Sequence, residues 1–225
     1  MSFFTNSIKH IPIIGALLVR LKKSFSPESS PFKGTGNSIH NNGTFKNVRY
    51  DIIGNNNEIW IGENTFISDT LIFIRGDHHR IIVENNCVVG GGEWWIEDDH
   101  CSLILHSNTT IEHAHLAVTE PFSMLEIHPD CMLAKQVEIR TGDSHSIIDN
   151  ETGLRINKAA NVILKEHVWV GAHAKILKGV TVGHNSIIAI AAVVTNDIPA
   201  HSIAAGIPAK VIRSNIDWKR ERIYD

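Results

Sequence analysis

The sequence predicts an all-β fold, a parallel β-helix of short stacked strands, and two repeat patterns support this prediction. Between residues 164 and 198 the chain repeats every six residues, and an aliphatic residue opens each unit. A longer period of 22 residues runs through the preceding part of the chain. A period of six fits neither a lone helix nor a lone strand, but it fits short strands that turn a corner every six residues. Three units make one triangular coil, and successive coils stack as parallel strands.

The six-residue units put matching residues at two fixed positions. The first position is aliphatic in every unit and should form an internal ladder: Leu164, Val170, Ile176, Val182, Ile188 and Val194. The fifth position is small or β-branched: Val168, Ala174, Val180, Ser186, Ala192 and Ile198. This regularity predicts a narrow prism over the C-terminal part of the chain.

The 22-residue period predicts a wider coil of the same kind. Its apolar columns are Ile39, Ile61, Val83, Leu105 and Ile127, then Phe45, Ile67, Val89, Ile111 and Leu133, and then Ile59, Ile81, Leu103, Leu125 and Ile147. A further column holds Asn42, Asn64, Asn86, Asn108 and Asp130, residue types that tolerate left-handed backbone at corners. The four extra residues per coil should form one lengthened corner, a polar ridge that carries Arg75, Asp77, Glu97, Asp98, Asp99 and Glu120.

An insertion interrupts the repeats between Ile147 and Leu164. The next equivalent of Ile127 should be residue 149, so fifteen residues are added. The inserted stretch is polar and lacks the six-residue pattern, so we expect it to project as a loop over residues 149–161. Loops that leave a rigid scaffold are where binding residues concentrate. Asp143 and His145 stand immediately before this loop.

Composition restricts the class of protein. The 225 residues carry a formal net charge of −3, which gives no sign of nucleic-acid binding. Three cysteines without a CxxC motif argue against a disulfide framework or a zinc knuckle and suit a reduced, cytoplasmic compartment. Cys87 and Cys131 share a column but lie two coils apart, roughly 9.5 Å, which is beyond disulfide reach. We therefore predict free, buried thiols.

Both ends of the chain read as short helices. Residues 3–23 have an amphipathic pattern, and their apolar run at 11–19 is too short to span a bilayer. Packing on the body or on a partner subunit is one interpretation, and peripheral membrane contact through Lys22 and Lys23 is the alternative. We expect the helix and a turn-rich linker over residues 1–36, the β-helix over 37–213, and a capping helix over 214–225.

Three local motifs make the pattern more specific. Val168-Trp-Val-Gly171 places Trp169 24 residues after His145, Ile176-Leu-Lys-Gly-Val-Thr-Val-Gly183 follows, and Val193–Pro199 precedes Ala204–Arg213. Together these stretches resemble the hexapeptide-repeat acyltransferases, which include sugar, serine and bacterial surface-polysaccharide O-acetyltransferases. The segment 143–149 with Arg155-Ile-Asn157 is most similar to the polysaccharide enzymes. The resemblance implies a left-handed β-helix, acetyl-CoA as acyl donor, and a homotrimer with sites in grooves between neighbours.

His145 is the expected catalytic base. Moving an acetyl group from a thioester to a hydroxyl requires removal of the alcohol proton, and a positioned histidine can accept it. Asp143, two residues earlier, would orient the ring, although a turn residue is an equal interpretation. The Trp169 indole N–H is one candidate donor to the oxyanion, a backbone N–H is another, and simple packing is the alternative for Trp169.

The resemblance also implies positions for both substrates. Those expected for the coenzyme are Gly171, Ala172, Ile190, Thr195, Asn196, Lys210 and Arg213. The two cations suit the coenzyme phosphates. Arg155 and Asn157 are expected to bind the acceptor, a hydroxyl of a surface polysaccharide or of its sugar precursor.

Three other functions stay open at this point. Serine, an amino sugar or a xenobiotic would serve as a small acceptor for the same chemistry. His106 and His128 fall in adjacent coils, and His113 and His115 share a strand, so a metalloenzyme resembling the γ-class carbonic anhydrases is a rival. We expect no metal, because stacked polar ladders explain these histidines more simply. The third alternative is a non-catalytic β-helix scaffold, which would not bind acetyl-CoA.

Overall fold

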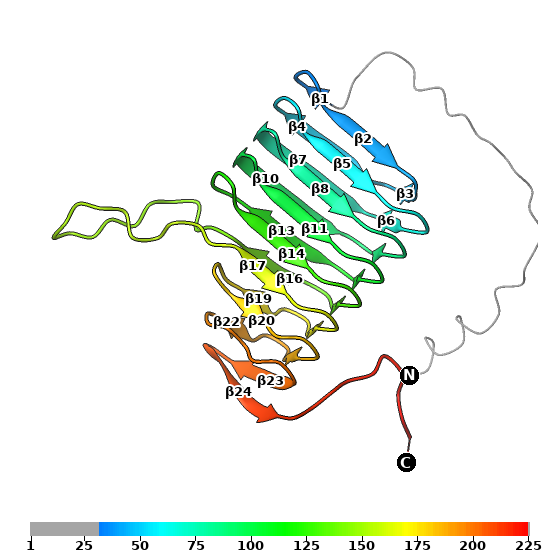
Figure 1. Cartoon of the computed structure of the whole chain (residues 1–225), viewed down its shortest axis with the longest axis vertical. Coiled ribbons are helices and arrows are strands. Elements are labelled where there is room, and N and C mark those ends of the chain that lie inside the picture. The colour runs from blue at the N-terminus through cyan, green and yellow to red at the C-terminus, as the bar shows by residue number, and fades with distance from the viewer. Residues whose placement is uncertain (1–31, 225) are drawn as a thin grey trace, which may run out of the picture. The chain divides into compact units, whose positions relative to one another are not determined.

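The computed structural model describes residues 32–224, which form a left-handed parallel β-helix with three faces (Figure 1). The expected N-terminal helix at 3–23 and its linker lie outside the described residues. Sheet 1 contains β1 (Phe32–Lys33), β4 (Arg49–Ile53), β7 (Thr70–Asp77), β10 (Gly92–Asp99), β13 (Ala114–Val118), β16 (Val137–Arg140), β19 (Lys175–Ile176) and β22 (Val193–Val194). The first of these strands begins five residues before the expected start of the β-helix at residue 37.

The other two faces are built in the same way. Sheet 2 contains β2 (Ser38–Asn41), β5 (Glu58–Ile61), β8 (Arg80–Val83), β11 (Ser102–Leu105), β14 (Met124–Ile127), β17 (Val162–Leu164) and β20 (Thr181–Val182). Sheet 3 contains β3 (Thr44–Lys46), β6 (Phe66–Ser68), β9 (Val88–Val89), β12 (Thr110–Ile111), β15 (Met132–Leu133), β18 (Trp169–Val170), β21 (Ile187–Ile188), β23 (Ser202–Gly206) and β24 (Ala209–Ser214). All strand pairs are parallel except β23–β24, which closes the C-terminal end as an antiparallel hairpin.

The register confirms most of the predicted columns. Ile127 pairs with Leu164, so the fifteen-residue insertion falls where the sequence placed it. Two column members were wrong. Leu125 pairs with Val162, and Ile147 is 54% exposed in the projecting loop. Ile39 pairs with Ile59 rather than Ile61, because the first coil is two residues shorter on this face.

The corners follow the residue types that the sequence put there. Asn64, Asn86, Asn108 and Asp130 all have positive φ, between 55° and 64°. The small residues behind them point inward and are buried, and their hydroxyl or thiol groups donate to carbonyls of the next coil. Thr65 donates to the Glu84 carbonyl at 2.6 Å and Cys87 to the His106 carbonyl at 3.2 Å. These short bonds tie neighbouring coils together inside the prism.

All three cysteines are free and buried, as predicted for Cys87 and Cys131. Burial raises the pKa of Cys87 to about 11 and the pKa of Cys131 to about 12. Because the thiolate is the reactive form, these thiols serve as small core residues rather than nucleophiles.

We expected the extra residues of the wide coils to form only a lengthened corner, and this expectation was incomplete. They also lengthen sheet 1, whose strands β7 and β10 each have eight residues and pair along their whole length. An additional buried column, Ile74, Ile96 and Val118, supports this extension from inside. The wide coils therefore have one broad outer face, and the polar ridge forms its far edge.

The predicted C-terminal helix is wrong, because residues 215–224 contain no helix. The segment instead lies along the coils, and its side chains bind residues far back in the sequence. The Trp218 indole donates to the His167 carbonyl at 2.8 Å, and its ring stacks on the His167 ring at 4.1 Å. Arg220 binds Asp130 and Thr110 at 3.0 and 2.9 Å. Such contacts outweigh the marginal helical tendency of a segment this short.

Within residues 32–224, no helix has the length and apolar character needed to cross a membrane.

Candidate active site

A hairpin loop leaves the prism between β16 and β17 and projects away from the coils (Figure 1). Ile148 and Arg155 form an antiparallel bridge, and Ile156 N–H donates to the Ile147 carbonyl at 2.9 Å. The Asp149 carboxylate caps the turn by accepting from the Thr152 N–H at 2.7 Å. Aspartate favours such turns because its side chain bonds to the backbone two or three residues on. The insertion is therefore an ordered hairpin that extends the predicted range of 149–161 back to residue 147.

Asn157 holds the base of this hairpin. Its side chain is 7% exposed, and its amide oxygen accepts from the Ile147 N–H at 2.7 Å. Its amide nitrogen donates to the His145 carbonyl at 2.7 Å and to the Asp143 carboxylate at 2.8 Å. The main chain of His145 is thus fixed while its imidazole stays exposed. These bonds occupy the Asn157 amide within the chain and position the His145 main chain, and the expected contact of Asn157 with the acceptor stays a prediction.

Asp143 has different partners from those we expected. Its carboxylate forms an ion pair with Lys178 and accepts from Asn157, and no hydrogen bond joins it to the His145 ring among the described residues. The Lys178 ammonium lowers the pKa of Asp143, and the Asn157 amide adds to this effect. Lys178 also donates to the Asn157 carbonyl at 2.9 Å. Asp143 and Lys178 therefore clamp the loop base onto the narrow coils.

Arg155 lies beside a hollow that also contains His145. Its guanidinium binds both carboxylate oxygens of Glu120, and this contact lowers the pKa of Glu120. The hollow has a volume of about 250 Å³ and is lined by Glu97, Asp98, Thr119, Glu120, Ser144, His145, Ser146 and Arg155. His145 therefore opens onto a polar space in which a hydroxyl-rich molecule would find both donors and acceptors.

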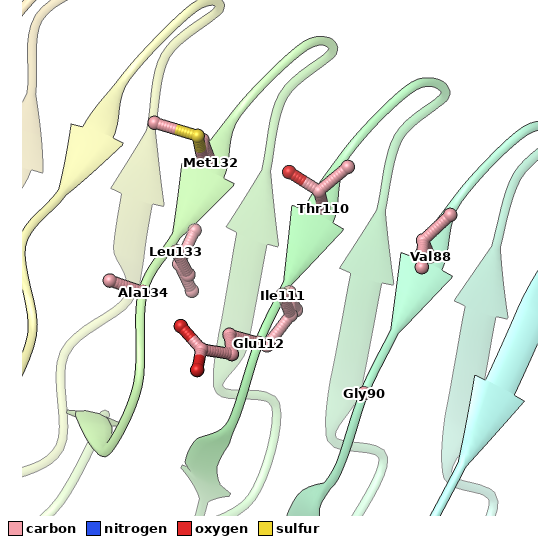
Figure 2. A pocket seen from close by; sticks show the side chains of 8 residues that line it. All are labelled: Val88, Gly90, Thr110, Ile111, Glu112, Met132, Leu133 and Ala134. Carbon is pink, nitrogen blue, oxygen red and sulfur yellow. The ribbon is translucent and has the colours of Figure 1, made fainter. Parts of the chain in front are cut away.

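Trp169 lies on a different face of the prism from His145. It belongs to β18 in sheet 3, where it pairs with Met132 and Ile187, and its ring contacts Trp218 at 5.9 Å. An apolar hollow of about 340 Å³ lies on the same sheet, and Figure 2 shows Val88, Thr110 and Met132 on its successive strands. Among the described residues of one chain, no hydrogen bond or ring contact joins Trp169 to His145.

The residues expected at the coenzyme fall into three groups. Gly171, Ala172 and Ile190 meet at the corner between sheets 3 and 1, where Ala191 N–H donates to the Ala172 carbonyl at 2.8 Å. A Cβ on Gly171 would meet Ile190 N at 2.7 Å, so close backbone approach requires glycine here. Ile190 is 70% exposed.

The other two groups lie at the next corner and at the closing hairpin. Thr195 and Asn196 follow β22 at the corner toward sheet 2. Lys210 and Arg213 stand exposed on β24, and no ion pair engages either of them within the described residues. The predicted positions thus share the narrow end of the prism and lie at three separate places on it.

A separate cluster contains two of the histidines that suggested a metal. The His106 ring is held between Glu84 at 2.8 Å and Glu126 at 2.9 Å, and the second Glu84 oxygen accepts from Ser107 N–H at 3.0 Å. Ligand atoms of His106, Glu126 and His128 lie within 4.8 Å of one another. Burial opposes the charged His106 ring, but bonds to Glu126 and Glu84 outweigh burial and raise the pKa of His106. The His106 ring thus forms a hydrogen-bonded ladder with two carboxylates.

Comparison with known proteins identifies the family. No protein-family model matches the chain. A polysialic acid O-acetyltransferase of Neisseria meningitidis is 35% identical over 128 residues, which are 57% of this chain and 59% of that protein. The crystal structure of the polysialic acid O-acetyltransferase OatWY matches with a TM-score of 0.81 and 30% identity, over 86% of this chain and 92% of that one. The polysialic-acid-specific acetyltransferase NeuO gives 0.76 and 32%, over 84% and 88%.

These likenesses define the class as the left-handed β-helix acetyltransferases. Because the matches to the two solved structures span most of both chains, this chain belongs to the hexapeptide-repeat acetyltransferase family that includes the polysialic acid O-acetyltransferases. The sequence match to the Neisseria meningitidis protein covers 59% of its length.

Proposed function

We propose that the protein transfers an acetyl group from acetyl-CoA to a hydroxyl of a bacterial surface polysaccharide or of its sugar precursor. The observation that carries this proposal is the setting of His145. Its main chain is fixed by Asn157, and its exposed ring opens onto a polar hollow at the base of the projecting hairpin. The relatives named polysialic acid O-acetyltransferases supply the reaction class and the kind of acceptor.

In this reaction His145 transfers one proton from the acceptor hydroxyl to the leaving sulfur. The acceptor oxygen attacks the thioester carbonyl as the neutral imidazole takes the hydroxyl proton, and an oxyanion forms on the former carbonyl. When this intermediate collapses, the C–S bond breaks and the imidazolium returns the proton to the leaving sulfur. One acetyl ester and one free thiol result, with no covalent enzyme intermediate. Asp143 takes no part in this relay, because it is engaged by Lys178.

The narrow end of the prism suits the acyl donor. Lys210 and Arg213 offer two exposed cations to the coenzyme phosphates, and no carboxylate of the described residues pairs with either. Gly171 and the exposed Ile190 would give the pantetheine a flat corner to lie along. Acetyl-CoA enters here as a substrate, and no metal is required for the step.

A complete site would need a second subunit. His145 follows sheet 1, whereas Trp169 stands on the outer face of sheet 3. The outward column of that face is mostly apolar: Phe66, Val88, Thr110, Met132, Trp169 and Ile187. A cyclic homotrimer would cover this column and place Trp169 of one subunit beside His145 of its neighbour. The indole N–H would then be available to the oxyanion.

The test is transfer of labelled acetyl from acetyl-CoA to polysialic acid and to a panel of neutral bacterial polysaccharides. We expect His145→Ala to lower kcat by about 10²–10⁴-fold, the usual contribution of a general base. His40→Ala, an exposed histidine on β2, is the matched control and should keep full activity. Equal transfer by His145→Ala and the wild type would sink the assignment, and absence of acetyl-CoA binding by calorimetry would favour a scaffold.

A further inference from the structure

The outer face of sheet 1 carries an aromatic stack next to the candidate active site. Phe73 on β7 and Trp95 on β10 pair in register, and their rings stack with centroids 3.8 Å apart and planes 19° apart. The Arg75 guanidinium lies 3.9 Å from the Phe73 ring centre and extends the stack along the same strand. Phe73 therefore covers one face of the Trp95 ring. The opposite face is turned toward β13, where the nearest ring, His115, lies 6.5 Å away and is tilted by 39°.

Next to that other face the sheet has a gap. Trp95 pairs with Ala117 on β13, and Ala117 pairs with Arg140 on β16. Ala117 is 6% exposed, but it alternates with the inward residues Leu116 and Val118 and pairs with outward Trp95, so its methyl group forms the floor of the outer face. A hollow of about 360 Å³ lies here, lined by Trp95, Glu97, His115, Ala117, Thr119, Arg140, Gly142 and Ser144. One small residue between two large ones leaves a slot on the surface.

The width of this slot fits a sugar ring. Trp95 and Arg140 are two strands apart, roughly 9.5 Å. A ring in van der Waals contact with a group on each side needs about 4 Å per contact, or roughly 8 Å in all. A pyranose has C–H groups on its faces and hydroxyls at its rim. Its faces suit Trp95 and the Arg140 stem, whereas its rim suits the Glu97 carboxylate and the Ser144 hydroxyl.

The slot also adjoins the hollow that contains His145. Glu97, Thr119 and Ser144 line both spaces. A glycan chain with one residue in the slot would therefore continue directly into the space before the His145 ring. Thr119 stands on the shared wall, where its buried hydroxyl has no hydrogen-bond partner among the described residues.

We propose that the slot between Trp95 and Arg140 is an acceptor subsite that holds one pyranose residue of a glycan chain, next to the residue that is acetylated. This assignment rests on the proposed function for the identity of the second space, but the slot itself is defined by its own residues. Trp95 provides the stacking face, the small Ala117 side chain leaves space for the ring, and the Glu97 carboxylate accepts hydrogen bonds from ring hydroxyls.

Saturation-transfer NMR with two hexasaccharides, one of sialic acid and one of maltose units, tests this subsite without any acetyl donor. For whichever hexasaccharide the wild type binds, we expect Trp95→Ala to weaken binding at least about tenfold. Trp95→Phe should restore most of the lost affinity. Ala117→Leu, which removes no contact but fills the slot, should also abolish binding. Trp60→Ala on sheet 2, another half-buried outward tryptophan, is the matched control and should bind as the wild type does.

Transfer kinetics separate this proposal from the proposed function. If the wild type transfers acetyl, Trp95→Ala should raise KM for the polysaccharide and leave KM for acetyl-CoA unchanged. If the protein binds a hexasaccharide through Trp95 but transfers no acetyl group, the subsite proposal stands and the proposed function is wrong. Unchanged hexasaccharide binding in both Trp95→Ala and Ala117→Leu overturns the subsite, as does absence of binding of both probes to the wild type.

Discussion

The wide and narrow coils of this prism share one interior but differ on the outside. Trp94, Leu116, Ile139, Ile176 and Val194 form a continuous column through both regions, paired strand by strand. On the outer face, however, the wide coils have eight-residue strands with Phe73 and Trp95, whereas β19 and β22 have two residues each. The buried ladder therefore maintains the fold, and the added length of one sheet supplies surface for ligands.

This difference suggests that the regions on the two sides of the inserted hairpin bind different substrates. The broad polar and aromatic face of the wide coils suits a glycan, and the narrow end with Lys210 and Arg213 suits a phosphate-bearing donor. His145 stands where the two regions meet, and the Asp143–Lys178 ion pair joins the loop base of the wide region to the narrow one. Three experiments address this comparison, in order of decreasing effect.

The largest expected effect comes from mixing two inactive variants. His145→Ala and Trp169→Ala should each lose most activity, and mixed trimers from co-expression should regain about one active site in three if a neighbour supplies Trp169. Each restored site pairs a subunit that keeps His145 with one that keeps Trp169. The measurement is kcat per trimer after purification of tagged mixed trimers. If mixed trimers stay inactive while both variants remain trimeric, Trp169 does not complete a site across subunits.

A second experiment separates the two ends of the prism. Lys210→Gln with Arg213→Gln should raise KM for acetyl-CoA by about tenfold or more, because charge-assisted contacts to phosphate are lost. The KM for the polysaccharide should stay constant, which is the reverse of the Trp95→Ala pattern. Lys219→Gln, an exposed lysine after β24, is the control. Raised KM for the polysaccharide in the double variant would contradict the division into donor and acceptor ends.

Local periodicity explains what the sequence revealed and what it did not. Repeats expose every residue that pairs with its equivalent one coil on, so the columns of Ile81, Leu103 and Leu125 were predictable. Ile147 was misplaced because an apolar residue inside the loop happened to keep the 22-residue spacing. The interior periodicity also could not show that four added residues lengthen a strand, since the new buried column of Ile74 and Ile96 simply continues the same alternation.

Contacts between distant residues account for the remaining errors. Lys178 stands 35 residues after Asp143. Although Lys178 lies in the motif Ile176–Gly183, no local pattern indicated that Asp143 is its partner. The C-terminal segment from residue 215 has an amphipathic helical pattern, yet the partners of Trp218 and Arg220 are 51 and 90 residues away. A pattern read along the chain measures local tendency, and in these segments tertiary contacts decide the conformation.

The smallest expected effect concerns stability, and it follows from a histidine–carboxylate cluster on the wide coils. The His106 ring lies between Glu84 and Glu126, and His128 and Ser107 complete its surroundings. The pKa of His106 is raised above its ordinary value of 6.5, so its stabilisation is complete below pH 6.5 and is lost as pH rises through the raised value. Glu84 has a lowered pKa even though burial opposes its charge, because bonds from Ser107 and His106 prevail. Hydrogen bonding from His106 lowers the pKa of Glu126, so both carboxylates contribute above pH 4.5 and lose their effect as pH falls through the lowered values.

The window in which all three groups contribute their full stabilisation therefore lies between about pH 4.5 and 6.5. We expect His106→Gln to lower Tm most in this window, by roughly 2–4 °C for each kcal/mol lost, and less at pH 8.5. Differential scanning calorimetry of wild type and variant from pH 5 to pH 8.5 measures the difference, and His40→Gln on exposed β2 should show none. A Tm difference for His106→Gln that is constant with pH would mean that a neutral ring packs here.

Full transfer activity after dialysis against a chelator, together with that pH dependence, would identify the cluster as an ionic ladder, whereas loss of activity on chelation would make His106, Glu126 and His128 a metal site.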